Sequence, residues 1–252
     1  MESKVQILAH RGGAITAPEN TREAFERAAQ EGAHGVECDV RLTRDGEPVL
    51  FHDRETRRLL GIPGRVEDFL WRDLQAQRVL GKGPVLHLRD FIDFLLRHPR
   101  MEAYFDLQEG SERGTLERIA ACVREARLAE RIYILGFSRQ RRWLLEAKKM
   151  DPGLRTAVMP ILPYDFVGCA RSVGAERLCA GWNQQWIAKP WFLFCSWVHS
   201  LKREVSRAKE QGLWVTGGLA NTEEELRWFL SLGFQGIWTD DLLLVRRFTK
   251  EG

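Results

Sequence analysis

The chain has 252 residues, of which 44% are apolar and 29% charged, and its formal net charge is +3. This length can bury a full-sized core, and α/β barrels often reach it as one domain. Charges of both signs are mixed without a polybasic tract, so we expect no nucleic-acid partner.

The five cysteines form no CxxC pair and are odd in number, which predicts reduced thiols in a cytoplasmic protein. The first 13 residues, MESKVQILAHRGG, lack the apolar region of a signal peptide. The longest apolar candidate, WFLFCSWV at 191–198, is too short to span a membrane. The sequence makes no prediction of oligomeric state.

Strand and helix patterns alternate along nearly the whole chain. Asn20, with Glu23 three residues later, is a helix-start signal for a helix that Gly32 closes. Further helices are predicted at 89–97, 114–127, 138–149, 199–211 and 222–232, and after Asp240. Strands are predicted at 5–10, 34–40, 47–53, 102–108, 131–137, 154–160, 177–180, 213–218 and 236–240. This alternation predicts an α/β fold of parallel βα units that suits a closed (β/α)8 TIM barrel.

One segment, residues 54–87, interrupts the alternation because it is rich in turn formers and has no clear period. It is too short for an independent core, so we interpret it as a small insertion after the second strand region. The whole chain, 1–252, is then expected to form a single domain.

Glu37 and Asp39 lie two residues apart on a predicted strand, so their side chains point to the same face. Two adjacent carboxylates repel each other, and a divalent cation such as Mg²⁺ or Ca²⁺ between them would relieve the repulsion. The alternative is an exposed face of an edge strand.

Two histidines follow predicted strands, His10 directly before Arg11 and His52 directly before Asp53. A single histidine in such a place is more often structural than catalytic. In a parallel barrel, however, all strand C-termini face one mouth, where both histidines could meet Arg11 and the two carboxylates. The remaining histidines are expected to be structural: His34, His87, His98 and His199.

Asp106 and Gln108 repeat the two-residue spacing at the end of another predicted strand. Asp106 would supply a third metal carboxylate, and Gln108 a neutral donor to an anionic oxygen. A purely structural pair is the alternative.

The motifs HRGG, APENT, VECDV and FHD within residues 7–53 closely resemble the start of the glycerophosphodiester phosphodiesterase family of metal-dependent TIM barrels. The resemblance continues through VLHLRDFIDFL at 85–95 and ends with LGFQGIWTDD at 232–241. It implies that His10 and His52 are the acid and base pair, that Arg11 binds phosphate, and that Glu37 and Asp39 bind metal.

The chain departs from the family pattern at several positions. Asp106 and Gln108 stand where the family usually has Glu-x-Lys, which removes a positive charge from the phosphate site. Gly136 replaces a usual serine, and GLAN at 218–221 replaces a late motif that carries a tryptophan of the substrate pocket.

The expected reaction is hydrolysis of a glycerophosphodiester to glycerol 3-phosphate and an alcohol. The metal and Arg11 would neutralise charge on phosphorus, one histidine would deprotonate the nucleophile and the other would protonate the leaving alkoxide. The sequence leaves open whether the nucleophile is water or a glycerol hydroxyl, and which histidine is the acid.

Five tryptophans fall within 182–214 and allow two interpretations. They could pack between the barrel and its outer helices, as most aromatic residues do. They could instead form an apolar rim that receives an acyl chain, which would make lysophospholipid a substrate. The five tryptophans are Trp182, Trp186, Trp191, Trp197 and Trp214.

Beside hydrolysis of a glycerophosphodiester or of a lysophospholipid, a third possible function is a non-catalytic barrel that binds phosphorylated ligands.

Overall fold

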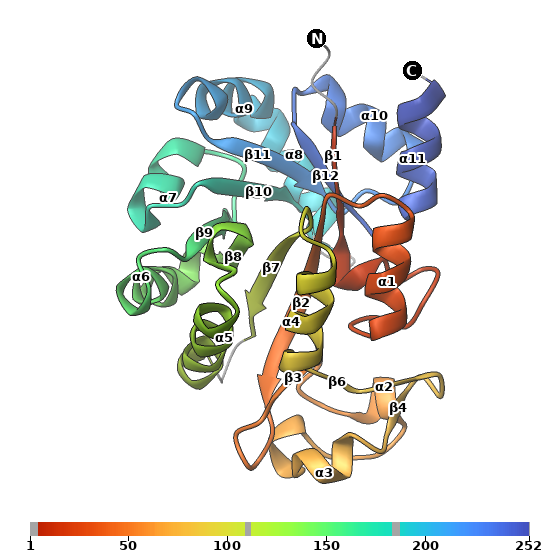
Figure 1. Ribbon diagram of the computed structural model, residues 1–252. Coiled ribbons are helices and arrows are strands. Elements are labelled where there is room, and N and C mark those ends of the chain that lie inside the picture. The colour runs from red at the N-terminus through yellow and green to blue at the C-terminus, as the bar shows by residue number, and fades with distance from the viewer. Residues whose placement is uncertain (1–4, 109–111, 183–186, 252) are drawn as a thin grey trace.

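Eight parallel strands close into a barrel in the computed structural model, which describes residues 5–108, 112–182 and 187–251 (Figure 1). Each strand pairs with the next in chain order, and β1 pairs with both β12 and β2 to close the ring. The barrel strands are β1 (Gln6–Ala9), β2 (Gly35–Leu42), β7 (Glu102–Leu107), β8 (Ile132–Phe137), β9 (Arg155–Met159), β10 (Arg177–Gly181), β11 (Trp214–Gly218) and β12 (Gly236–Thr239). The predicted (β/α)8 barrel is confirmed.

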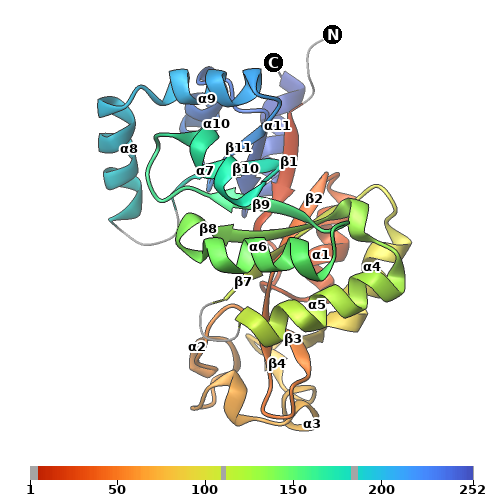
Figure 2. The same ribbon diagram turned by 90° about the vertical axis from the view of Figure 1, so that its left-hand side faces the viewer.

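Helices connect successive strands and surround the barrel (Figures 1 and 2). They are α1 (Arg22–Gln30), α4 (Leu88–Arg97), α5 (Glu112–Ala126), α6 (Arg141–Met150), α7 (Phe166–Val173), α8 (Ala188–Val198), α9 (Leu201–Glu210), α10 (Glu223–Ser231) and α11 (Leu242–Glu251). The sequence analysis missed α7 and α8. Helix α8 is apolar on nearly all sides, so it lacks the alternation of polar and apolar faces by which a surface helix is recognised.

Side-chain alternation on the strands separates the inside of the barrel from its outer layer. On β2, Val36, Cys38 and Val40 belong to the large core between strands and helices, so Glu37 and Asp39 between them point into the barrel. Apolar side chains fill the barrel interior, including Leu8, Tyr104, Tyr133 and Trp238. The barrel is therefore packed in its middle, and polar side chains lie at its two ends: Gln6, Glu102 and Arg177 bond to one another at the strand starts, and the carboxylates of β2 lie towards the other end.

The predicted strand at 47–53 does not join the parallel barrel. It appears as β3 (Pro48–Leu50), which is antiparallel to β2 and places Leu50 opposite Val40. Strand β2 is eight residues long and extends past the mouth, and β3 runs back along this extension. His52 thus lies at the mouth after an antiparallel strand. The prediction that it follows a parallel barrel strand, as His10 does, was wrong.

Residues 54–87 form short elements below the barrel in both views (Figures 1 and 2). The elements are α2 (Arg57–Leu60), α3 (Trp71–Leu74), β4 (Arg78–Val79), β5 (Gly83–Pro84) and β6 (Leu86–His87). Each is two to four residues long, which explains why the sequence shows no period here. Apolar residues of this segment pack with two residues of the preceding one, Val49 and Phe51, in a small separate cluster that also contains Leu59, Val66, Leu74, Val79 and Val85.

The start of α1 differs from the prediction. Thr21, not Asn20, caps the helix by accepting a hydrogen bond from the backbone N–H of Ala24. Asn20 instead has a left-handed backbone with φ of 56°. This conformation frees its side chain for the barrel mouth. No helix within the described residues is long and apolar enough to cross a membrane.

Candidate active site

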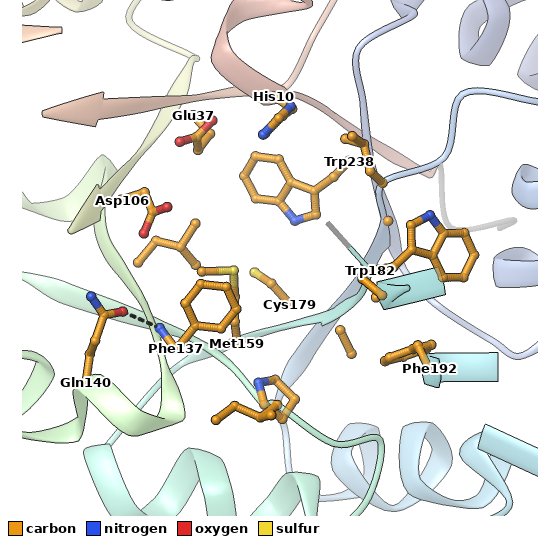
Figure 3. A pocket seen from close by; sticks show the side chains of 18 of the residues that line it. His10, Glu37, Asp106, Phe137, Gln140, Met159, Cys179, Trp182, Phe192 and Trp238 are labelled. Atoms are coloured by element: carbon orange, nitrogen blue, oxygen red, sulfur yellow. Dashed lines mark hydrogen bonds between the residues drawn. The ribbon is translucent and has the colours of Figure 1, made fainter. Parts of the chain in front are cut away.

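A cavity of about 670 Å³ opens at the C-terminal mouth of the barrel. Its polar end holds both predicted catalytic histidines, His10 and His52, and the predicted phosphate ligands, Arg11 and Gln108. Figure 3 shows His10, Glu37 and Asp106 gathered at this end of the cavity. The opposite end is apolar.

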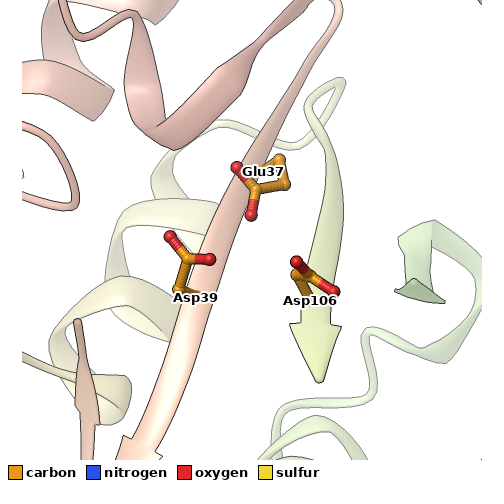
Figure 4. A group of neighbouring side chains, drawn as sticks. All are labelled: Glu37, Asp39 and Asp106. Carbon is orange, nitrogen blue, oxygen red and sulfur yellow. The ribbon is translucent and has the colours of Figure 1, made fainter. Parts of the chain in front are cut away.

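Glu37, Asp39 and Asp106 converge in the way the sequence predicts (Figure 4). One ligand atom from each lies within 4.8 Å of the others, and Asp39 and Asp106 are direct neighbours across β2 and β7. Glu37 and Asp39 are buried, which excludes the alternative of an exposed edge-strand face.

Burial and mutual repulsion make these carboxylates hard to ionise. Burial, followed by the charge of Asp39, raises the pKa of Asp106 to about 7. Burial and the charges of Asp39 and Asp106 also raise the pKa of Glu37 well above its usual value. The cluster is therefore short of positive charge.

Amide groups bridge part of this acidic cluster. Gln108 Nε2 donates to Asp39 Oδ1 at 2.6 Å and to Asp106 Oδ2 at 3.1 Å. Asn20 Nδ2 donates to Asp39 Oδ2 at 2.7 Å, and the Asn20 carbonyl oxygen accepts from the Asp39 backbone N–H. These neutral donors orient the carboxylates without cancelling their charge.

His10 is held by a carboxylate directly after the last strand of the barrel. Its Nδ1 lies 2.7 Å from Asp240 Oδ1, and Asn221 donates from Nδ2 to the other oxygen of Asp240. Burial opposes ionisation, but the bonds from His10 and Asn221 lower the pKa of Asp240. An ionised Asp240 only accepts, so Nδ1 of His10 carries the proton and Nε2 is left for the cavity.

His52 is anchored in the same way by its own neighbour. Its Nδ1 lies 2.7 Å from Asp53 Oδ1, and Arg58 binds both oxygens of Asp53. Burial works in the opposite direction, yet hydrogen bonds from Arg58 and His52 lower the pKa of Asp53 to about 2. Nε2 of His52 is therefore also the nitrogen without this carboxylate contact.

Arg11 lies inside the acidic cluster. Its backbone N–H donates to Glu37 Oε2 at 2.9 Å, which its left-handed conformation with φ of 51° permits. Its guanidinium contacts Glu19 at 3.1 Å and Asp39 at 3.3 Å. Burial alone would lower the pKa of Arg11, but the surrounding carboxylates raise it, so the side chain stays cationic.

Arg41 is a second buried cation at the cavity that the sequence analysis did not identify. Its Nε donates to the carbonyl oxygen of His52 at 2.8 Å, and its Nη2 lies 3.4 Å from Gln108 Oε1. Arg41 lies two residues after Asp39 on β2 and lines the cavity, so the same-face pattern of Glu37 and Asp39 was the available signal.

The other missed residues act through those already described. Asp240 and Asn221 position His10, while Glu19 and Asn20 position Arg11 and Asp39. All four lie in the quoted motifs APENT, GLAN and WTDD, but only the fold shows which group each one contacts.

The tryptophans divide between the two interpretations. Trp182 packs against Phe192, Trp228 and Phe229 while one side lines the cavity. Trp191 lines the cavity and Trp197 is 82% exposed. Trp214 lies under Arg177 at the start of β11, away from the mouth, and Trp186 lies outside the described residues.

Comparison with known proteins identifies the family of the chain. The sequence model of the glycerophosphoryl diester phosphodiesterase family matches residues 10–244. A curated glycerophosphodiester phosphodiesterase of Caldanaerobacter subterraneus is 27% identical over 251 residues, covering 94% of this chain and 95% of that protein.

Solved structures show the same fold. A phosphodiesterase of Oleispira antarctica, in complex with the product sn-glycerol-3-phosphate, superposes with a TM-score of 0.80 at 20% identity, covering 98% of this chain and 97% of that one. The glycerophosphodiester phosphodiesterase of Thermotoga maritima superposes with a TM-score of 0.76 at 20% identity, covering 98% of both chains. The chain therefore belongs to the glycerophosphoryl diester phosphodiesterase family and is a phosphoric diester hydrolase.

Proposed function

We propose that the protein hydrolyses glycerophosphodiesters to glycerol 3-phosphate and an alcohol with the help of a divalent cation. One observation carries the proposal. Two histidines, each tied at Nδ1 to an aspartate, line the same cavity as the acidic cluster of Glu37, Asp39 and Asp106. An imidazole pair next to an acidic cluster is what acid and base attack on a phosphodiester requires.

The acidic cluster suits a hard cation. Three carboxylates within 4.8 Å offer oxygen ligands only, which Mg²⁺ and Ca²⁺ prefer over the nitrogen and sulfur ligands typical of zinc. The raised pKa values of Glu37 and Asp106 indicate uncompensated negative charge, which a cation would neutralise. When bound, the cation would stabilise the charge that builds on the phosphate oxygens.

The histidines move the protons. With Nδ1 donating to Asp240 or Asp53, the Nε2 atom of a neutral imidazole accepts a proton and that of an imidazolium donates one. One Nε2 takes the proton of the attacking oxygen as the new P–O bond forms. The other gives a proton to the leaving alkoxide as the old P–O bond breaks.

Arg11 and Gln108 are the proposed phosphate ligands. Arg11 lines the cavity and stays cationic among its carboxylate neighbours, so its guanidinium offers positive charge to an anionic phosphate. Gln108 Nε2 donates to Asp39 and Asp106, so its amide would bind phosphate by exchanging one of these carboxylates for a phosphate oxygen. Arg41 next to it supplies the charge that Gln108 lacks. The phosphate would thus meet Arg11 in the turn after β1 and Arg41 on β2.

A lysophospholipid is a second candidate substrate, and the apolar end of the cavity favours it. Figure 3 shows Phe137, Met159, Trp182 and Phe192 across the cavity from the carboxylates. A phosphodiester placed at the acidic cluster could extend an acyl chain along these side chains, which burial would stabilise. The headgroup would then be the alcohol that leaves.

We also propose that the enzyme works in the cytoplasm. All five cysteines are free, and none is paired in a disulfide. Free thiols are typical of a reducing compartment.

The test assays the purified enzyme on glycerophosphocholine and on lysophosphatidylcholine, with Mg²⁺ or Ca²⁺ and with EDTA. We expect EDTA to abolish turnover, and His10→Asn and His52→Asn each to lower kcat by roughly 10²- to 10⁴-fold. His98→Asn, which alters a histidine bonded to Glu26 on the outside of the barrel, is the matched control. Tight binding of either diester without hydrolysis would favour the non-catalytic barrel.

A further inference from the structure

Exposed apolar side chains are concentrated at one side of the cavity mouth. Of the eleven large apolar side chains that are exposed among the described residues, seven lie within 161–164 and 187–198. Ile161, Ile187 and Trp191 are each about half exposed and also line the cavity. The apolar surface is thus continuous with the apolar end of the cavity.

Helix α8 and the residue before it carry most of this surface as a single stripe, which we call the aromatic ridge: Ile187, Trp191, Phe194, Trp197 and Val198. Spacings of three and four residues put these side chains on one helix face. The Trp191 and Phe194 rings are 6.0 Å apart and the Phe194 and Trp197 rings 6.5 Å apart, so the ridge is unbroken.

The opposite face of α8 is apolar as well. Phe192 and Cys195 are buried, and the Phe192 ring contacts Trp182. This side attaches the helix to the barrel. A helix with two apolar faces usually packs against an apolar partner on each side, and the barrel covers only one face of α8. The aromatic ridge faces the missing partner.

The charge around the ridge indicates what that partner is. From Ile187 to Arg203 the chain has three cations, Lys189, Lys202 and Arg203, and no carboxylate. Lys189 pairs with Glu225 on α10 at 2.6 Å, so Lys202 and Arg203 are the two cations that this pair leaves for lipid. Lys202 and Arg203 are exposed directly after the ridge. Tryptophan and tyrosine favour the headgroup depth of a bilayer, and flanking cations favour anionic lipid. The ring of Tyr164 lies 5.1 Å from that of His199, which brings the neighbouring loop into the same surface.

We propose that the aromatic ridge docks this enzyme on a phospholipid bilayer, with Trp191, Phe194 and Trp197 inserted at headgroup depth. A bilayer on the ridge would adjoin the cavity mouth, so a single-chain diester could pass from lipid onto the apolar wall. A second copy of the chain on the same face would instead cover the opening. The route of the substrate depends on the proposed hydrolase function, whereas docking itself does not.

The experiment measures co-sedimentation of the full chain with vesicles of phosphatidylcholine alone and with phosphatidylglycerol added. We expect wild type to bind, and to bind more tightly with the anionic lipid. Phe194→Ser with Trp197→Ser should weaken binding by about tenfold or more, because both rings lose buried area in the lipid. Leu96→Ser with Leu243→Ser, which removes two exposed apolar side chains on α4 and α11, should leave binding unchanged.

Catalysis separates docking from the hydrolase function. Neither Phe194 nor Trp197 lines the cavity, so the double variant should hydrolyse dissolved glycerophosphocholine like wild type and act more slowly only on vesicle-borne lysophosphatidylcholine. Absence of vesicle binding by wild type, or equal binding by the double variant, would overturn the proposal. The proposal would also be overturned if the wild type formed a dimer, the double variant were a monomer, and neither bound vesicles. Failure to hydrolyse either diester would overturn the proposed function and leave co-sedimentation to decide docking.

Discussion

The acidic cluster predicts that a divalent cation stabilises the fold most at alkaline pH. Burial and Asp39 raise the pKa of Asp106 from 3.8 to about 7. A raised carboxylate pKa means that the folded state holds its proton more tightly than the unfolded state. The cost of ionising Asp106 is therefore absent below about pH 4, grows as pH rises, and is complete above about pH 7. A shift of this size corresponds to roughly 4 kcal/mol, taken as an upper limit.

A cation bound by the cluster should remove this cost. At a concentration of about 100 times its Kd, a ligand that binds only the folded state adds about 2.7 kcal/mol. For a chain of this size, about 2–4 °C of Tm accompanies each kcal/mol. We therefore expect Mg²⁺ or Ca²⁺ to raise the Tm by roughly 5–10 °C at pH 8, and by much less at pH 5, where protons compete for the same oxygens.

Thermal unfolding followed by circular dichroism measures this shift without relying on activity. Asp106→Asn removes one of the repelling charges, so we expect a higher Tm than wild type at pH 8 in EDTA and little response to cation. Asp90→Asn is the matched control, because Asp90 pairs with Arg22 on the surface and should leave both values unchanged. Equal wild-type Tm with EDTA and with saturating cation at pH 8 would refute the reasoning.

Two further predictions concern groups that the fold brings to the cavity. Asp240→Asn should lower kcat by about 10²-fold or more and move the His10 limb of the pH–rate profile to lower pH. The reason is that a neutral partner no longer fixes the Nδ1–H tautomer of His10 or stabilises its imidazolium. An unchanged pH–rate profile would show that Asp240 does not have this role. Arg41→Gln should raise KM for glycerophosphocholine by about tenfold. Adding Gln108→Lys should restore part of the lost affinity, because it returns a cation to the same end of the cavity. If steady-state kinetics showed no rescue, Arg41 would act only through its hydrogen bond to His52.

Local pattern predicted the barrel and the acidic cluster because each depends on short-range geometry. The two-residue spacing of Glu37 and Asp39 on β2 fixes a shared face. The same spacing relates Asp106 on β7 to Gln108 directly after this strand. Once the barrel closes, adjacent strands bring these faces together, with Asp39 opposite Asp106. The sequence needed only the correct strand boundaries to place the cluster.

Pairings over long sequence distances could not be predicted in the same way. His10 and Asp240 are 230 residues apart and meet only because β1 pairs with β12. Asn20 matched a helix-cap signal, but a left-handed backbone turned it towards Asp39. His52 was predicted at the mouth because it was expected to follow a parallel barrel strand. It lies there because it follows β3, which runs antiparallel to β2 and returns the chain to the mouth.

Gln108 carries no charge, so the positive charges at the cavity come from other positions. Three guanidiniums line the cavity, Arg11, Arg41 and Arg139, against Glu37 and Asp106, with Asp39 directly behind them. Without a cation, Arg11 is already paired with Glu19 and Asp39, so the cavity offers little net attraction to an anionic diester. A divalent cation leaves a surplus of positive charge at the place where phosphate must sit. Substrate affinity and cation affinity should therefore rise together, because each ligand supplies the charge that the other needs.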